Sequence, residues 1–205
     1  MVKREEEEEE RGGKLKMLEY VIEGHDGSAK TPIVDGVKNR LERAGLVVEV
    51  CAPFQVVNNQ IEEEDIYLYW QNDEMTTKAL ELLSNAINYA RQKAKDNGAD
   101  ILLYDRHWLT IVGEIDHRNK FEWEDYRPTF FIEAPVEKTM DCKRFSFAIP
   151  WTSSVEVITD CYDKYLVLAE KYSEHIVQKY RVEKRTQPLG GIIDSIYDHI
   201  IREYA

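Results

Sequence analysis

The sequence Tyr20-Val21-Ile22-Glu23-Gly24-His25-Asp26-Gly27-Ser28-Ala29-Lys30-Thr31 lies between two different hydrophobic patterns. An apolar run over 18–22 comes first, and its length is typical of a buried strand. Pro32 and an apolar series with helical spacing come afterwards, and that series consists of Ile33, Val34, Val37 and Leu41. Proline suits the first turn of a helix, where its missing N–H costs little. The sequence therefore predicts a strand, a tight loop and a helix.

The loop follows the pattern G-x-x-x-x-G-K-[ST] from Gly24 to Thr31, with Ala29 in place of the second glycine. Loops of this kind bind phosphate through backbone N–H groups and the positive end of the helix dipole. Lys30 would reach the β- and γ-phosphates of ATP, and the Thr31 hydroxyl would bind Mg²⁺. The methyl group of Ala29 is tolerated at negative φ and strained at positive φ. The alternative is a strand–turn–helix that binds nothing.

The chain has 205 residues, of which 43% are apolar, enough for one α/β domain with a sizeable core. No apolar run approaches the ~20 residues of a membrane span. Three cysteines without metal-ligand spacing predict a reduced, cytoplasmic protein.

Net charge separates a short tail from the domain. Residues 1–16 carry five basic and six acidic side chains, a net charge of −1, so −11 of the total of −12 belongs to 17–205. We expect 1–16 to be a disordered acidic tail and 17–205 to be the folded domain. Such an acidic domain argues against nucleic-acid binding, but it allows a small anionic substrate in a local basic pocket.

Strand and helix patterns alternate along the rest of the chain. Strands are expected at 46–50, 101–104, 129–132 and 176–178, helices at 31–44, 74–97 and 153–172 and after Pro188, and a loop at 53–60. This alternation predicts an α/β fold, a five-stranded parallel sheet with helices on both faces. Ligands of such sheets bind beyond the carboxyl ends of the strands. Both the phosphate-binding loop and Asp105-Arg106 are predicted to lie there.

Two motifs together resemble the thymidylate kinase family of P-loop nucleoside and nucleotide kinases. The first is Glu23-Gly24-His25-Asp26-Gly27-Ser28-Ala29-Lys30-Thr31, which is similar to the family's E-G-x-D-G-S-G-K-T. The second is Asp105-Arg106-His107, which is similar to D-R-[YFH] after the third strand. The order of elements also matches, from Leu18 to the C-terminus. The resemblance implies a P-loop nucleotide kinase architecture with a short lid.

The resemblance also implies a role for individual residues. ATP phosphates would be cradled by the loop, namely Gly24, His25, Asp26, Gly27, Ser28, Ala29, Lys30 and Thr31. Thr31, together with Asp105 through a water molecule, would hold Mg²⁺, and Lys30 would bind the transferring phosphoryl group. Asp26 would face the acceptor sugar, and Arg106 would bind the acceptor phosphate. Arg144 in the lid and Gln187 in a loop over the adenine would complete the donor site.

The acceptor half departs from the family pattern. Cys51-Ala52-Pro53-Phe54 stands where the family has R-E-P-G, so one acceptor arginine is missing. The helix that carries F-x-x-x-R in the family reads Leu82-Leu83-Ser84-Asn85-Ala86-Ile87-Asn88. Arg91 or Tyr89 is a candidate substitute there. The donor half is intact, whereas the acceptor half is rebuilt.

Three functions remain open at this point. A nucleoside monophosphate acceptor needs cations, of which Arg106 is the clearest, and this is the function we favour. A nucleoside acceptor needs a general base, for which Glu23 and Asp26 are the nearest acids. The third is an ATP-binding protein without kinase turnover. We also expect a homodimer through the helix 74–97, which offers Leu80, Leu83, Ile87 and Ala90.

Overall fold

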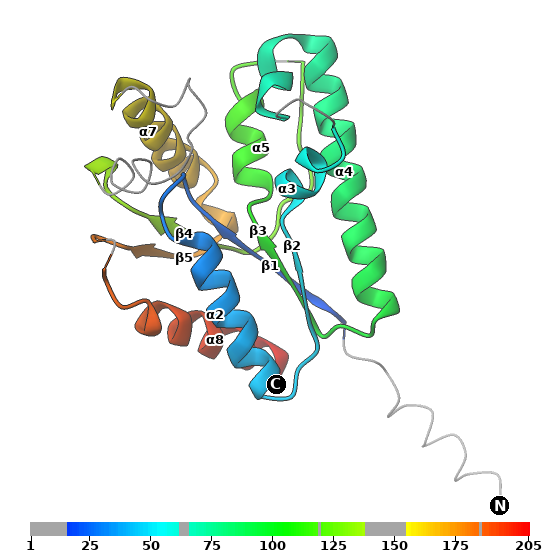
Figure 1. The fold of residues 1–205 in the computed structure, drawn as a ribbon, viewed down its shortest axis with the longest axis vertical. Coiled ribbons are helices and arrows are strands. Elements are labelled where there is room, and N and C mark those ends of the chain that lie inside the picture. The colour runs from blue at the N-terminus through cyan, green and yellow to red at the C-terminus, as the bar shows by residue number, and fades with distance from the viewer. Residues whose placement is uncertain (1–15, 62–65, 119, 138–154, 185) are drawn as a thin grey trace, which may run out of the picture.

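One parallel sheet forms the centre of the molecule in the computed structural model, which describes residues 16–61, 66–118, 120–137, 155–184 and 186–205 (Figure 1). Its strand order is β2-β3-β1-β4-β5 and every pairing is parallel. The strands are β1 (Leu18–Glu23), β2 (Val48–Cys51), β3 (Ile101–Asp105), β4 (Thr129–Glu133) and β5 (Ile176–Arg181). The predicted five-stranded α/β sheet is confirmed. The predicted tail, apart from Lys16, and the predicted lid around Arg144 lie outside the described residues.

Helices cover both faces of the sheet (Figure 1). One face carries α2 (Lys30–Arg43) and α8 (Gly190–Tyr204). The other carries α3 (Pro53–Asn58), the 3-10 helix η1 (Ile66–Gln71), α4 (Asp73–Asp96), α5 (Trp108–Ile115) and α7 (Val155–Lys171). A short 3-10 turn, η3 (Ser173–His175), leads from α7 into β5. Each face of the sheet has its own hydrophobic core. Because successive strand residues point to opposite faces, Tyr20 and Ile22 belong to the core under α2 and α8, whereas Val21 belongs to the core on the other face.

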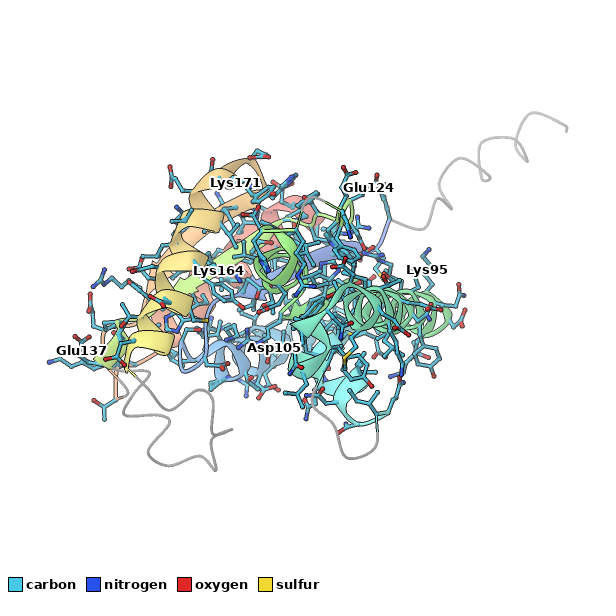
Figure 2. The ribbon with its side chains drawn as sticks, turned by 90° about the horizontal axis from the view of Figure 1, so that it is seen from above. Lys95, Asp105, Glu124, Glu137, Lys164 and Lys171 are labelled. Carbon is cyan, nitrogen blue, oxygen red and sulfur yellow. The ribbon has the colours of Figure 1, made fainter. Side chains whose placement is uncertain are left out.

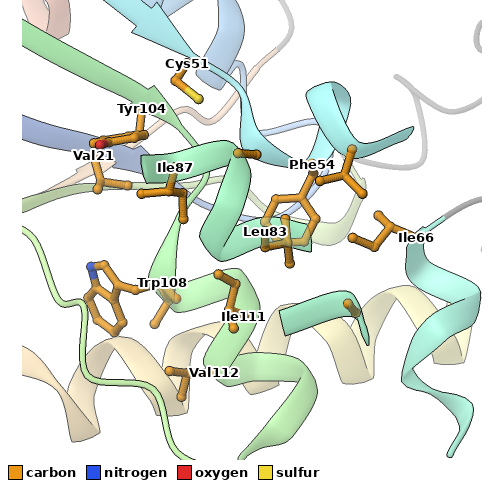
Figure 3. Packing of buried hydrophobic residues seen from close by; sticks show 14 of the residues in the cluster. Val21, Cys51, Phe54, Ile66, Leu83, Ile87, Tyr104, Trp108, Ile111 and Val112 are labelled. Carbon is orange, nitrogen blue, oxygen red and sulfur yellow. The ribbon is translucent and has the colours of Figure 1, made fainter. Parts of the chain in front are cut away.

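Two helices differ from the sequence-based expectation. The predicted loop at 53–60 is wrong, because Pro53 occupies the start of α3, where proline is favoured, and Phe54 and Val57 are buried. Figure 3 shows Phe54 close to Leu83 of α4 and Ile66 of η1. The helix α5 has no counterpart among the expected elements. All of its residues except Glu114 are buried, so its sequence lacks the periodicity of an amphipathic helix.

The sheet brings three strand ends together at the centre of one edge. β1 lies between β3 and β4, and Ile22 pairs in register with Asp105. The Arg106 N–H extends this pairing by donating to the Ile22 carbonyl at 3.2 Å. In Figure 2, which looks down on the molecule from above, Asp105 lies near the middle, with α7 to one side. The loop after β1 and the residues after β3 therefore lie side by side beyond the carboxyl ends of these strands, as the sequence predicts.

Within the described ranges, none of the helices is long and apolar enough to cross a membrane.

Candidate functional site

The loop between β1 and α2 bends through three residues with positive φ. These are Gly24 at 151°, Gly27 at 78° and Ala29 at 74°. Gly24 also makes a close approach, since a Cβ there would lie 2.2 Å from the carbonyl oxygen of Ile132 in β4. Ala29 is the N-cap residue of α2 and has the left-handed conformation, which is strained for a residue with a Cβ. The loop thus has the tight curvature that a phosphate-binding loop needs, and Ala29 bears strain for it.

Lys30, the first residue of α2, lies across this loop. Its side chain is buried, and Nζ donates a hydrogen bond of 2.8 Å to the His25 carbonyl oxygen. Burial, together with the positive charge of Arg106, lowers the pKa of Lys30 to about 8. A cation with so little solvent around it is poised to pair with an anion that enters the loop.

Thr31 and Asp105 meet where α2 begins and β3 ends. The Thr31 hydroxyl donates to Asp105 Oδ2 at 2.5 Å. A hydroxyl and a carboxylate side by side are oxygen ligands of the kind that Mg²⁺ takes, together with substrate phosphates and water. The described residues contain no cluster of three or more histidine, cysteine or carboxylate side chains that could hold a metal by itself. The Thr31 hydroxyl and the Asp105 carboxylate by themselves fit two oxygen positions around a Mg²⁺ ion.

Arg106 follows β3 in an unusual backbone conformation, with φ at 69°. Its Nη1 donates to Tyr165 Oη at 3.0 Å and to Thr110 Oγ1 at 3.3 Å. Its Nη2 forms an ion pair with Asp26 of the loop between β1 and α2. The guanidinium is thus held between the loop, α5 and α7. Asp26, Lys30, Asp105 and Arg106 all come together, as the sequence predicts.

Glu23 lies behind Arg106 rather than in the open site. Its side chain has no exposed surface. Oε2 accepts a hydrogen bond of 2.7 Å from the His107 N–H, and Oε1 accepts one of 2.5 Å from the Thr110 hydroxyl. Burial raises the pKa of this carboxyl group, and the nearby Arg106 and these hydrogen bonds oppose the shift. Glu23 therefore holds α5 against β1, and we expect it to act through these neighbours.

A cleft of about 410 Å³ lies in front of these groups. The residues that line it are Asp26, Gly27, Ala29, Lys30, Thr31, Pro32, Ala52, Phe54, Gln55, Asn58, Asp105 and Arg106. Gln55 and Asn58 were not expected at the site, because the sequence predicted a loop where α3 stands. Asn58 also accepts a hydrogen bond of 2.9 Å from the Ile66 N–H, which ties η1 to α3. The cleft combines two cations, two carboxylates and carboxamides.

The remaining donor-site candidates have mainly internal contacts. The two ring nitrogens of His25 lie 2.7 Å and 2.8 Å from the carbonyl oxygens of Ala134 and Asp26, and burial lowers the pKa of His25 to about 4. The Ser28 hydroxyl is buried and has no hydrogen-bond partner in the part of the chain that is described. The Gln187 amide accepts a hydrogen bond from the Glu183 N–H and donates one to the carbonyl oxygen of Arg181, the last residue of β5.

The two proposed substitutes on α4 do not reach the cleft. Arg91 pairs instead with Glu19 and Asp125, at 2.7 Å each. Glu19 lies near the amino end of β1, whereas the cleft lies beyond the carboxyl ends of the strands. Arg91 therefore serves to pack α4 against the sheet. Tyr89 is 70% exposed and is not among the residues that line the cleft.

The helix face expected to form a dimer is largely internal. Leu83 and Ile87 are buried within the chain, and Leu80 and Ala90 pack partly buried against the same core. These side chains are therefore explained by the fold of one chain.

Comparison with known proteins establishes the fold. The structure is similar to a thymidylate kinase from Candida albicans, with a TM-score of 0.61 and 13% identity over 92% of each chain. That protein's structure is described as revealing the origin of its broad substrate specificity. Neither a protein-family model nor a curated protein matches the sequence. The chain thus has a thymidylate kinase-like fold.

Proposed function

We propose that the chain is an ATP- and Mg²⁺-dependent kinase that phosphorylates a nucleoside monophosphate. In this reaction an oxygen of the acceptor phosphate attacks the γ-phosphorus of ATP. The bond from that phosphorus to the bridging β–γ oxygen breaks, and its electron pair leaves with ADP. Transfer of this kind depends on positioning and on stabilising charge more than on covalent chemistry. A thymidylate kinase-like fold with cations at its central strand ends supports this class.

The donor half rests on the loop and on three side chains. Lys30 is buried beside the loop, where its charge would act on the phosphates with little solvent screening. Thr31 and Asp105 would hold Mg²⁺, which would neutralise charge on the β- and γ-phosphates when bound. Lys30 would exchange its contact with the His25 carbonyl for a contact with phosphate.

The position of Arg106 is the observation that carries the acceptor assignment. Its guanidinium lines the same cleft as Lys30, and protein contacts hold it on two sides. Arginine suits phosphate because its planar N–H groups match two phosphate oxygens at once. Its ion-pair partner Asp26 has a side chain that is 62% exposed. The Arg106 side chain is only 13% exposed, so the carboxylate is the solvent-facing partner of this pair, and an entering phosphate that supplies the same negative charge can take its place.

A hydroxyl acceptor fits the site less well because it needs a base. Glu23 is buried and both of its oxygens accept hydrogen bonds from the protein. Asp26 is paired with Arg106. A phosphate acceptor is already ionised and needs no base, which favours the monophosphate.

An ADP-release assay with ATP and Mg²⁺ tests this function against a panel of nucleoside monophosphates and nucleosides. We expect turnover with a monophosphate and at least a hundredfold loss, roughly 3 kcal/mol, in Lys30→Ala. Lys38→Ala is the matched control, since Lys38 lies on the same helix and pairs with Glu42 at the surface. ATP binding without ADP release would instead indicate a nucleotide-binding protein. Equal rates in Lys30→Ala and the wild type would refute the donor site.

A further inference from the structure

Arg106 keeps a backbone conformation that non-glycine residues rarely adopt, with φ at 69°. Such a conformation persists only where the surrounding structure holds the residue in place. The peptide N–H of Arg106 donates to the Ile22 carbonyl near the carboxyl end of the central strand β1, which fixes the backbone. The direction of the side chain must come from other contacts, and two of them are hydroxyl groups, on Tyr165 and Thr110.

These contacts form one connected series of hydrogen bonds. Arg106 Nη1 lies 3.0 Å from Tyr165 Oη, Tyr165 Oη lies 2.7 Å from Thr110 Oγ1, and Thr110 Oγ1 lies 2.5 Å from Glu23 Oε1. All four residues lie within the fold, and Glu23 and Thr110 are at most 1% exposed. Tyr165, on α7, is 7% exposed.

The chemistry of the groups gives the series a single direction. Arginine can only donate, and an ionised carboxylate can only accept. Glu23 accepts from the His107 N–H at Oε2 and from the Thr110 hydroxyl at Oε1. With Glu23 in the ionised form, which the nearby Arg106 charge favours, Thr110 gives its one proton to Glu23, and Tyr165 donates to Thr110 while it accepts from Arg106. Each hydroxyl then has a defined orientation, and the oxygen of Tyr165 faces the guanidinium as an acceptor.

We propose that Tyr165 is a positioning residue that aims Arg106 at the acceptor phosphate. The proposal rests on the function proposed above. Tyr165 does not line the cleft, so it acts through Arg106 and not on the substrate. Nη1 of the guanidinium donates to both Tyr165 and Thr110, and Nη2, which pairs with Asp26, would meet the phosphate once the carboxylate is displaced. Without the tyrosine oxygen the guanidinium would rotate, and the acceptor would meet it in a poorer geometry.

The first test is Tyr165→Phe, which keeps the ring and removes the hydroxyl. We expect kcat/KM for the monophosphate to fall about tenfold, the size of one lost hydrogen bond to a charged group, while the KM for ATP stays within about twofold. Tyr204→Phe is the matched control. It removes a tyrosine hydroxyl that donates to Asp100 at 2.8 Å, before the start of β3 and away from the cleft. If Tyr165→Phe raised the KM for ATP by as much as it lowered kcat/KM for the monophosphate, the tyrosine would have a general structural role, and the proposal would be overturned.

The second test combines Tyr165→Phe with Arg106→Lys. If Tyr165 acts through the guanidinium, its substitution has little further effect once that guanidinium is gone, so the two changes are strongly non-additive. Additive losses would mean that Tyr165 acts by another route, which contradicts the proposal.

A third measurement separates this proposal from the proposed function. The ¹⁵N–¹H signals of the Arg106 guanidinium, identified by their absence in Arg106→Lys, report its rotation without any substrate. We expect slow rotation in the wild type and in Tyr204→Phe, and fast rotation in Tyr165→Phe. If the wild type phosphorylated no acceptor, the proposed function would be wrong. The guanidinium signals would still show whether Tyr165 holds Arg106, because they are measured without substrate. Unchanged signals in Tyr165→Phe would overturn the positioning role whatever the activity.

Discussion

Replacing Ala29 by glycine should stabilise the protein. Ala29 has φ at 74° and ψ at 27°, and an L-residue in this region bears roughly 1–2 kcal/mol of strain that glycine does not. Glycine also gives the unfolded chain more conformational freedom, and this lowers the stability gained from relieved strain by about 0.4–1 kcal/mol. The net gain is about 1 kcal/mol, which corresponds to a rise of about 2–4 °C in Tm for a chain of this size.

Urea unfolding of the wild type, Ala29→Gly and Ala44→Gly isolates the strain. Ala44 ends the same helix with φ at −80°, so glycine relieves no strain there and should lower the free energy of unfolding by about 0.4–1 kcal/mol. The two variants should therefore differ by roughly 1–2 kcal/mol, the left-handed strain itself. If Ala29→Gly lowered stability as much as Ala44→Gly, the loop would not have the backbone described above.

Three further perturbations test the loop and its neighbours. Between pH 7 and 9 the ligand-free protein loses the Lys30 proton, because its pKa is lowered to about 8. Bound phosphate favours the charged amine, so calorimetry should show the Kd for ATP rising with pH and proton uptake on binding near pH 8; a flat Kd would contradict this. Thr31→Val should raise the Mg²⁺ concentration needed for half-maximal ADP release roughly tenfold, the size of one lost oxygen ligand, and an unchanged Mg²⁺ dependence would remove Thr31 from the metal site. Gly24→Ala should lower the free energy of unfolding by more than about 2 kcal/mol, because its Cβ would lie 2.2 Å from the Ile132 carbonyl oxygen; a urea midpoint like that of the wild type would show that the loop can move away from β4.

Local patterns were enough to predict most of the fold. The apolar run before Gly24 and the helical spacing after Thr31 lead to β1 and α2 as observed. The two misjudged helices have clear causes. Pro53 was interpreted as a loop residue although it starts α3, and α5 is buried on nearly every side, so its sequence has no polar face to mark it.

The candidate site was only partly predictable for a different reason. Lys30, Thr31, Asp105 and Arg106 follow strand ends, and parallel strands bring such ends together. Tyr165 is 59 residues from Arg106 along the chain, and its contact depends on how α7 packs on α5. Arg91 shows the reverse case, since a basic residue on a suitable helix proved to pair with Glu19 and Asp125. No local pattern distinguishes these two outcomes, because both are decided by tertiary packing.

The central claim is that Arg106 receives a phosphate group on the acceptor. The most direct measurement is the ratio of kcat/KM for a monophosphate to kcat/KM for its parent nucleoside, in the wild type and in Arg106→Lys. We predict a wild-type ratio of at least about a hundred, since a paired arginine–phosphate contact is worth about 3 kcal/mol, and a much smaller ratio in Arg106→Lys. A wild-type enzyme that preferred the nucleoside, or a ratio that Arg106→Lys left unchanged, would contradict the account.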